Sequence, residues 1–180
     1  MKYATVCLLA MFLFACKSTV ENIKVDNDLI TSPDQGYLLI GIQTSHDLKS
    51  MLLTGQAGIE LTHKDLSADA DYILINLPAG DYKIRKIDLS KYFYLSFDED
   101  LIWDFTIQAG KVNYIGHLEM FTRGYYRPST YVDLVNKSSQ ALQFMQESYP
   151  TILNKRSLVF GGTGNDEFLT FVAEQQGETE

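Results

Sequence analysis

The sequence KYFYLSFDEDLIWDFTIQAGKVNYIGHLEM (Lys91–Met120) contains the clearest alternation of residue types in the chain. Successive side chains of a β-strand point to opposite faces of its sheet, so a period of two predicts strands. We expect strands over Lys91–Phe97, Leu101–Ile107 and, after a turn at Ala109-Gly110, Lys111–Phe121. The residues predicted to face inward are Phe93, Leu95, Phe97, Leu101, Trp103, Phe105, Ile107, Val112, Tyr114, Leu118 and Met120. Those predicted to face the other way include Tyr92, Tyr94, Asn113, His117 and Glu119.

Shorter β-rich stretches lie on both sides of this region. Before it the pattern predicts strands at Gly36–Gln43, Ile59–His63, Tyr72–Leu77 and Asp81–Ile87, and after it Thr130–Val135 and Ser157–Phe160 are further candidates for strands. The turn Pro78-Ala79-Gly80 makes a hairpin of one neighbouring pair, because proline pre-sets the turn and glycine accepts a positive φ.

The period of the apolar residues changes after Ser138. The residues at helical spacing are Leu142, Met145, Tyr149 and Ile152 or Leu153. We expect a helix that Ser138 caps and that Pro150 ends or kinks. A short terminal helix is expected over Asp166–Gln175, with Thr163 and Asp166 at capping-box spacing.

These elements together predict a mainly β domain over residues 36–180. Seven or eight short strands followed by a helix are typical of a single antiparallel β-sandwich, here α+β at its C-terminus, with the C-terminal helix packed on it. We expect Tyr92 and Tyr94 to lie beneath that helix, which must cover an apolar surface.

Two segments carry a resemblance to a known family. LPAGDYKI (Leu77–Ile84) resembles the Leu-Pro-x-Gly-x-Tyr hairpin of transthyretin-like and carboxypeptidase-regulatory-like sandwich domains. IQAGKVNYIGHLEM (Ile107–Met120) is similar to the start of a later strand in bacterial lipoproteins of that shape. The resemblance covers roughly residues 36–122 and implies a non-catalytic binding or structural module without assigned site residues.

The N-terminus has the pattern of a secretory signal. Lys2 precedes an uncharged run, Ala4–Ala15, that is shorter than the roughly 20 residues a membrane-spanning helix needs. Leu13-Phe14-Ala15-Cys16 resembles the lipobox of bacterial lipoproteins, which implies cleavage between Ala15 and Cys16 and a covalent lipid on Cys16. A plain signal peptide that happens to contain a cysteine is the alternative.

This interpretation divides the chain into a signal peptide (residues 1–15), a lipidated cysteine with a polar tether (16–35) and the domain (36–180). It predicts a location in the bacterial cell envelope. An aspartate directly after the lipidated cysteine would resemble an inner-membrane retention signal, but the residue at that position is Lys17. This resemblance favours the outer membrane if the organism has two membranes.

The net charge of the chain limits the classes of binding partner, and its two cysteines limit the covalent links that it can form. The chain has 23 acidic and 15 basic residues, a formal net charge of −8, which disfavours nucleic acid and anionic headgroups. The expected partners are the membrane, through the acyl anchor, and another envelope protein or a glycan. Cys7 would leave with the signal peptide and Cys16 would carry the lipid, so the mature chain would have no cysteine for a disulfide. We expect no cofactor beyond the covalent lipid.

The candidate site residues are few. His117 and Glu119 are two apart on a strand and so share a face, but a metal site needs further ligands and an ordinary strand face is favoured. The turn with Asp98, Glu99, Asp100 and Asp104 is interpreted as a solvated acidic turn, and Gly161–Gly164 as a flexible connector. A possible contact surface comprises Arg123, Tyr125, Tyr126, Arg127 and Tyr131.

The sequence contains no catalytic motif, and we assign no catalytic residue. The favoured hypothesis is a membrane-anchored envelope lipoprotein that acts as a non-catalytic binding or structural module, or as an accessory subunit. The alternative is a hydrolase that cuts an envelope polymer with a pair of carboxylates, whose separation is a three-dimensional quantity that the sequence leaves open.

Overall fold

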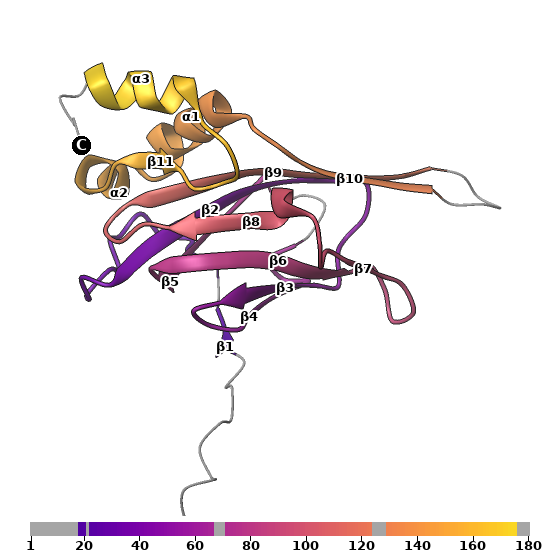
Figure 1. Ribbon diagram of the computed structural model, residues 1–180. Coiled ribbons are helices and arrows are strands. Elements are labelled where there is room, and N and C mark those ends of the chain that lie inside the picture. The colour runs from indigo at the N-terminus through magenta and orange to yellow at the C-terminus, as the bar shows by residue number, and fades with distance from the viewer. Residues whose placement is uncertain (1–17, 21, 67–70, 124–128, 176–180) are drawn as a thin grey trace, which may run out of the picture.

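The computed structural model describes residues 18–20, 22–66, 71–123 and 129–175. Two β-sheets pack on each other in a sandwich-like arrangement, and three helices cover the outer face of one sheet (Figure 1). The mainly β class and the C-terminal helical layer are therefore as the sequence predicts. No helix among the described residues is long and apolar enough to cross a membrane.

Sheet A is formed around the long strand β6 (Gly80–Asp88). Its strand order is β1 (Ser18–Thr19), β4 (Ile59–Thr62), β3 (Ser50–Gly55), β6 and β7 (Tyr94–Ser96), with β8 (Asp104–Ile107) pairing the other end of β6. Sheet B has the order β10 (Ser129–Val135), β9 (Val112–Arg123), β2 (Gln35–Thr44) and β5 (Tyr72–Pro78). β11 (Leu158–Phe160) pairs the start of β9.

The predicted strand count and direction need correction. The described residues form eleven strands rather than seven or eight, and the pattern did not predict β1, which has two residues, or β3. The sheets are also mixed, since β2 and β11 run parallel to β9 and β1 runs parallel to β4. A parallel pair such as β2 and β9 forms between strands far apart in the chain, and no local turn signals it.

The space between the sheets holds the larger apolar core. Its fully buried members include Leu38, Ile40, Met51, Leu53, Leu61, Ile73, Ile75, Ile84, Ile87 and Leu118. A second core lies on the other face of sheet B, where the helices α1 (Ser138–Ser148), α2 (Pro150–Lys155) and α3 (Glu167–Gln175) contact it. It contains Tyr37, Leu39, Leu74, Val112, Tyr114, Ala141, Met145, Ile152 and Leu169. Strands β2 and β9 are consequently buried on both faces.

The caps of two helices differ from the prediction. Ser138 is the first residue of α1 and is not its cap; its amide donates to Asn136 Oδ1 at 3.0 Å. Asp166 alone caps α3, by accepting from the Leu169 amide at 2.7 Å, whereas Thr163 is bonded elsewhere. Pro150 does end the first helix and is the first residue of α2, as expected of a residue that fixes φ and lacks an N–H.

A β-bulge at Gly116 changes which side chains of β9 point inward. Leu39 of β2 pairs with Tyr114, but Gly41 pairs with His117, so β9 has one extra residue there, and Gly116 has a φ of +126°. The alternation shifts by one, and Tyr114 and His117 both face the helices. The outward orientation predicted for His117 is therefore wrong, and this residue is 6% exposed. Asn113 lies before the bulge and was also predicted to face outward, but it is 0% exposed because its side chain bonds the backbones of Gln108 and Tyr37.

The segment Lys91–Trp103 also departs from its alternation. Only β7 is a strand there, and Leu101–Trp103 form a 3₁₀ turn in which Trp103 stacks on Phe97 at 3.9 Å. Phe93 and Leu101 are exposed, not inward. Tyr92 and Tyr94 are exposed as well, and they do not lie beneath a helix, because the helices cover sheet B and these residues border sheet A.

The segment predicted as a polar tether lies against the domain from Asn22 onward. Ile23 is 8% exposed, and its amide bonds the Leu74 carbonyl at 2.8 Å. Asp28 is clamped by Tyr37 Oη at 2.9 Å and by Arg156, whose Nη2 lies 2.8 Å from its carboxylate. Burial raises the pKa of Asp28, but the hydrogen bonds from Arg156 and Tyr37 outweigh it and lower the pKa below its usual value. Ala15 and Cys16 lie outside the described residues.

Candidate functional site

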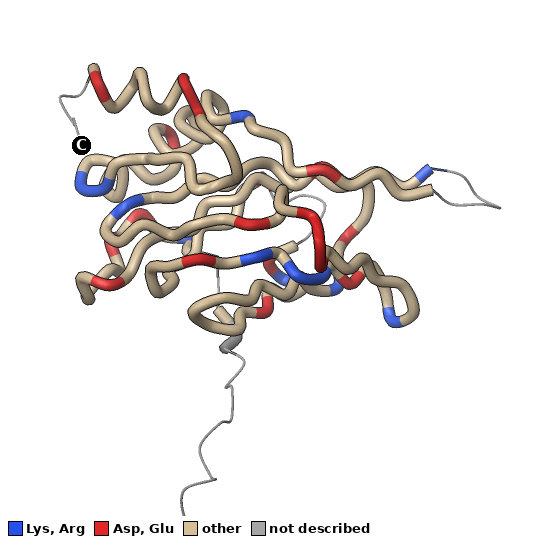
Figure 2. Tube along the Cα trace, in the orientation of Figure 1, with Lys and Arg blue, Asp and Glu red and all other residues tan. Residues whose placement is uncertain are grey.

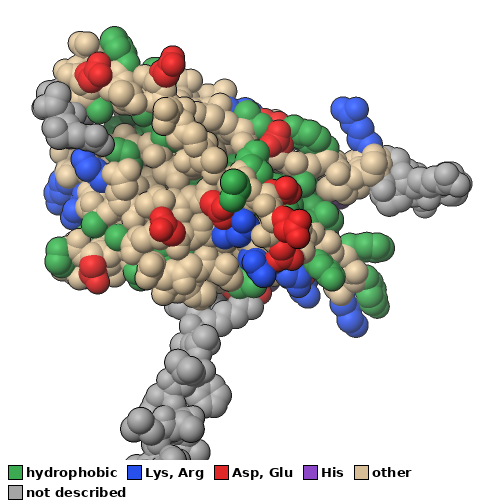
Figure 3. Space-filling view, in the orientation of Figure 1, with side chains coloured by type: hydrophobic (Ala, Val, Ile, Leu, Met, Phe, Trp, Pro, Cys, Tyr) green, Lys and Arg blue, Asp and Glu red, His purple; other side chains and the backbone are tan. Residues whose placement is uncertain are grey.

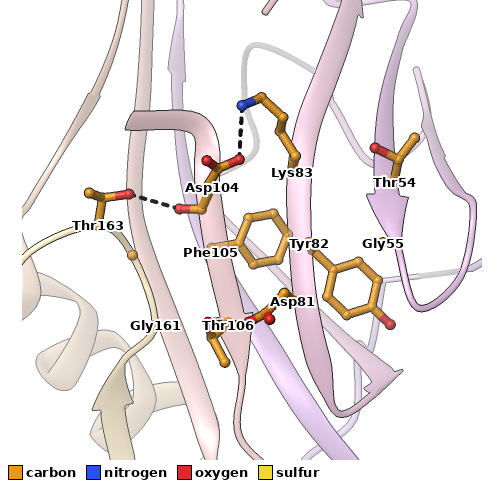
Figure 4. A pocket seen from close by; sticks show the side chains of 11 residues that line it. Thr54, Gly55, Asp81, Tyr82, Lys83, Asp104, Phe105, Thr106, Gly161 and Thr163 are labelled. Carbon is orange, nitrogen blue, oxygen red and sulfur yellow. Dashed lines mark hydrogen bonds and ion pairs between the residues drawn. The ribbon is translucent and has the colours of Figure 1, made fainter. Parts of the chain in front are cut away.

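An open groove lies on the outer surface of sheet A, where β3, β6 and β8 meet the segment after β11 (Figure 4). Its volume is about 520 Å³. The side chains that face it alternate with core residues along their strands, so Asp81 and Lys83 of β6 point outward while Tyr82 between them is buried. The groove residues are Thr54, Gly55, Asp81, Tyr82, Lys83, Asp104, Phe105, Thr106, Gly161, Gly162 and Thr163.

Each charged side chain of the groove is bonded to a neighbouring group of the protein. Lys83 Nζ lies 2.9 Å from the Asp104 carboxylate and 3.1 Å from the Asp100 carbonyl. Thr106 Oγ1 donates to Asp81 at 2.8 Å. The groove thus combines fixed hydrogen-bonding groups of both charge signs, and its acids already have partners within the fold.

The glycine segment closes one side of the groove. The amide of Gly161 donates to the Tyr114 carbonyl in sheet B, and its carbonyl accepts from the Thr106 amide in sheet A at 2.8 Å. A Cβ at this position would lie 2.5 Å from the Thr106 carbonyl oxygen, so only glycine allows this approach. Thr163 Oγ1 bonds the carbonyls of Leu101 and Asp104. The segment predicted as a flexible connector therefore joins the two sheets.

His117 and Glu119 share a face, as predicted, but each has its own protein partner. His117 Nδ1 lies 2.6 Å from Tyr114 Oη, and Glu119 lies 2.6 Å from Lys137 Nζ. Burial, with a smaller contribution from Lys137, lowers the pKa of His117 to about 4, so the ring is neutral near pH 7. No cluster of three metal-ligating side chains occurs in the described ranges.

A polar network surrounds this histidine beneath α1. Tyr114 Oη accepts from the Lys137 amide at 2.9 Å and forms a second hydrogen bond, of 2.6 Å, with His117 Nδ1. Tyr72 packs edge-on against the His117 ring at 4.9 Å and stacks on Phe144 at 4.1 Å. Burial raises the pKa of Tyr72 to about 12. These contacts fix the ring between sheet and helix and give it a structural role.

Exposed aromatic side chains gather on the loop between β6 and β7 and on the first residue of β7. Tyr92, Phe93 and Tyr94 are 78%, 69% and 61% exposed. Hydrophobic side chains project from the molecule at that end, at the lower right of Figure 3. Lys86 Nζ lies 4.7 Å from the centre of the Tyr94 ring, and Lys91 Nζ lies 5.6 Å from that of Tyr92.

The predicted contact surface is described only at its ends. Arg123 is exposed, and Tyr131 is 53% exposed and donates to Asp133 at 2.8 Å. Tyr125, Tyr126 and Arg127 lie outside the described residues.

The acidic turn is partly neutralised by neighbouring strands. Asp98 pairs with Arg85 at 2.8 Å, and Asp104 pairs with Lys83. Figure 2 shows acidic positions on both sheets and on α3 rather than in this turn alone. The turn therefore resembles the solvated acidic turn that the sequence predicts.

A second groove of about 780 Å³ separates α3 from β11. Leu158, Phe160 and Leu169 line it together with the carboxylates of Glu167 and Glu174. The described residues thus offer two grooves and one exposed aromatic loop as candidate binding features.

Comparisons of the chain with protein-family models, with curated proteins and with solved structures find no match. The candidate sites are therefore judged on their geometry.

Sequence reasoning missed the groove, although its alternating polar residues Asp81 and Lys83 were a usable signal. It also missed the aromatic loop, because Tyr92, Phe93 and Tyr94 continue the alternation of a strand and so were divided between two faces. Three consecutive aromatic residues after Ser90-Lys91 could have indicated an exposed turn.

Proposed function

We propose that the chain is a membrane-anchored lipoprotein of the bacterial cell envelope whose domain is a non-catalytic binding module. The lipobox-like Leu13–Cys16 supports the anchor, and β1 begins only two residues after Cys16. With Asn22 onward packed on the domain, a lipid on Cys16 would hold the domain close to the membrane rather than on a long flexible spacer.

The observation that carries the binding role is the state of the groove on sheet A. Asp81, Lys83 and Asp104 are held by neighbouring side chains, so the groove presents a fixed polar surface without a free acid or base. Such a surface suits a polar ligand that forms hydrogen bonds, which in an envelope means a glycan or a segment of another protein.

The anchor can be tested with two cysteine substitutions. Cys16→Ser should block lipid attachment, leave the precursor unprocessed and remove the mature chain from the lipid-labelled fraction. Cys7→Ser is the matched control, because this residue lies in the proposed signal peptide and should leave processing unchanged. Normal processing and lipid labelling of Cys16→Ser would refute the lipoprotein assignment.

The binding role can be tested by placing a photo-crosslinking amino acid at Thr106 in the groove and, as a control, at Gln146, which is exposed on α1. In intact envelopes we expect a discrete adduct from position 106 that is absent from position 146. Identical adduct patterns from the two positions would argue against the groove as the binding surface.

The alternative function is a carboxylate-dependent hydrolase, and one observation favours testing it: Asp81 and Asp104 line the same groove. Asp104→Asn would abolish release of soluble fragments from purified peptidoglycan if this residue were an acid–base group. For a binding module, neither wild type nor variant should release fragments above background.

A further inference from the structure

We propose that the aromatic loop (Lys91–Tyr94) inserts into the headgroup region of the bilayer that carries the anchor. The inference rests on the proposed lipid anchor, but on a different part of the chain. The loop projects beyond the end of sheet A, at the lower right of Figure 1. Each of its three aromatic side chains is more than 60% exposed, so neither the sheets nor the helices provide their apolar contacts.

The loop is braced by its own backbone. The amides of Leu89 and Ser90 donate to the Phe93 carbonyl at 2.9 and 3.1 Å. Ser90 Oγ accepts from the amides of Tyr92 and Phe93, both at 3.2 Å. The loop conformation is therefore set before any contact is made, which reduces the entropy lost on binding.

The chemistry of the loop suits a membrane interface. Tyrosine places an apolar ring and a polar hydroxyl in one side chain, and lysine can bury its stem while its ammonium group stays in water. Lys91 and Lys86 lie beside the rings of Tyr92 and Tyr94 in this way. Because all three rings are exposed on a projecting loop, they fit a soft headgroup layer better than a flat protein surface.

Charge selects the type of lipid. The chain has a formal net charge of −8. At this end of the domain Lys86 is paired with Asp88 at 2.8 Å, and the exposed Glu99 and Asp100 in the turn after β7 outnumber Lys91, so an anionic surface would repel it. We therefore expect insertion into zwitterionic headgroups. The anchor keeps the loop at a high effective concentration near the bilayer, so even weak insertion is sufficient to orient the domain.

The test uses the lipidated chain reconstituted in phosphatidylcholine vesicles. Lys91→Cys supplies a thiol for an environment-sensitive fluorophore and keeps all three aromatic residues, while Cys16 is blocked by its lipid. Glu174→Cys, on the exposed surface of α3, is the matched control. We expect a blue-shifted emission and severalfold stronger quenching by headgroup-proximal nitroxide lipids at position 91 than at position 174.

A second variant distinguishes insertion of the aromatic loop into the bilayer from a position merely close to the vesicle surface. Replacing Tyr92, Phe93 and Tyr94 with serine in the Lys91→Cys chain should remove the shift and most of the quenching. Equal quenching at positions 91 and 174 in chains that float with vesicles would overturn the inference while leaving the anchor intact. A blue shift that appears only with envelope protein and not with vesicles would overturn it in favour of a protein partner. Failure to float would refute the anchor, and the inference with it.

Discussion

Acidification should destabilise the domain through His117. The ring is 6% exposed, and its Nδ1 is hydrogen-bonded to Tyr114 Oη in the layer between sheet B and α1. Protonation of the ring would place a charge in a poorly hydrated site beside the Lys137 ammonium group. Burial is the main cause of the lowered pKa.

The direction and the size of the stability loss on acidification follow from the difference in proton binding between the folded and unfolded chains. The pKa of His117 falls from 6.5 to about 4 on folding, so between these values the unfolded chain binds more protons than the folded chain. Stability from this residue is therefore complete above about pH 6.5 and is lost as the pH falls toward 4. A difference of about 2.5 pKa units corresponds to ~3 kcal/mol, a large part of the stability of an ordinary domain.

Urea unfolding at a series of pH values would measure this loss. His117→Gln keeps a side chain that can hydrogen-bond with Tyr114 but does not titrate, so its stability should vary by ~3 kcal/mol less than wild type over this range. His63→Gln, at an exposed histidine, is the control and should follow the wild-type curve. The carboxylates are common to all three proteins. If wild type and His117→Gln show parallel pH profiles, the depressed pKa of His117 is refuted.

Two further predictions concern close contacts in the fold. Gly41→Ala would place a Cβ 2.3 Å from the His117 ring and should cost about 1–3 kcal/mol of unfolding free energy, whereas Gly58→Ala meets no atom within 4 Å and should change it by less than about 0.5. Equal effects in urea unfolding would contradict the contact. Arg156→Ala leaves the Asp28 carboxylate, 9% exposed, without its ion pair and should cost about 1–3 kcal/mol, with faster proteolysis of the N-terminal segment. Unchanged proteolysis would mean that this ion pair does not hold the segment.

Local signals predicted most of the elements. Alternation located β9, the β5–β6 hairpin and the inward residues Trp103, Phe105 and Ile107, all of which are buried. Helical spacing located α1, and Pro150 marked its end. These signals work because each depends on neighbours within one strand or one helical turn.

The alternation of residue types predicted the wrong exposure where tertiary contacts, and not the strand itself, decide whether a side chain is buried. Asn113 and His117 have polar side chains, yet both are buried. Asn113 bonds the backbones of Gln108 and Tyr37, and the bulge at Gly116 turns His117 toward Tyr72 and Tyr114. Phe93 follows an apolar pattern but is 69% exposed on the loop before β7. Hydrophobicity alone therefore did not separate core from surface at either place.

By itself, the sequence determined the mainly β class, the position of the long strands and the C-terminal helices, because these follow from backbone preference and local periodicity. It also supplied the lipobox-like segment on which the anchor proposal depends. Only the tertiary structure decided the parallel pairing of β2 with β9, the joining of the sheets by Gly161, and the docking of residues 22–35 through Asp28 and Arg156. Those features bring together residues more than 45 positions apart, and their stability depends on the burial of groups that no short stretch of sequence can specify.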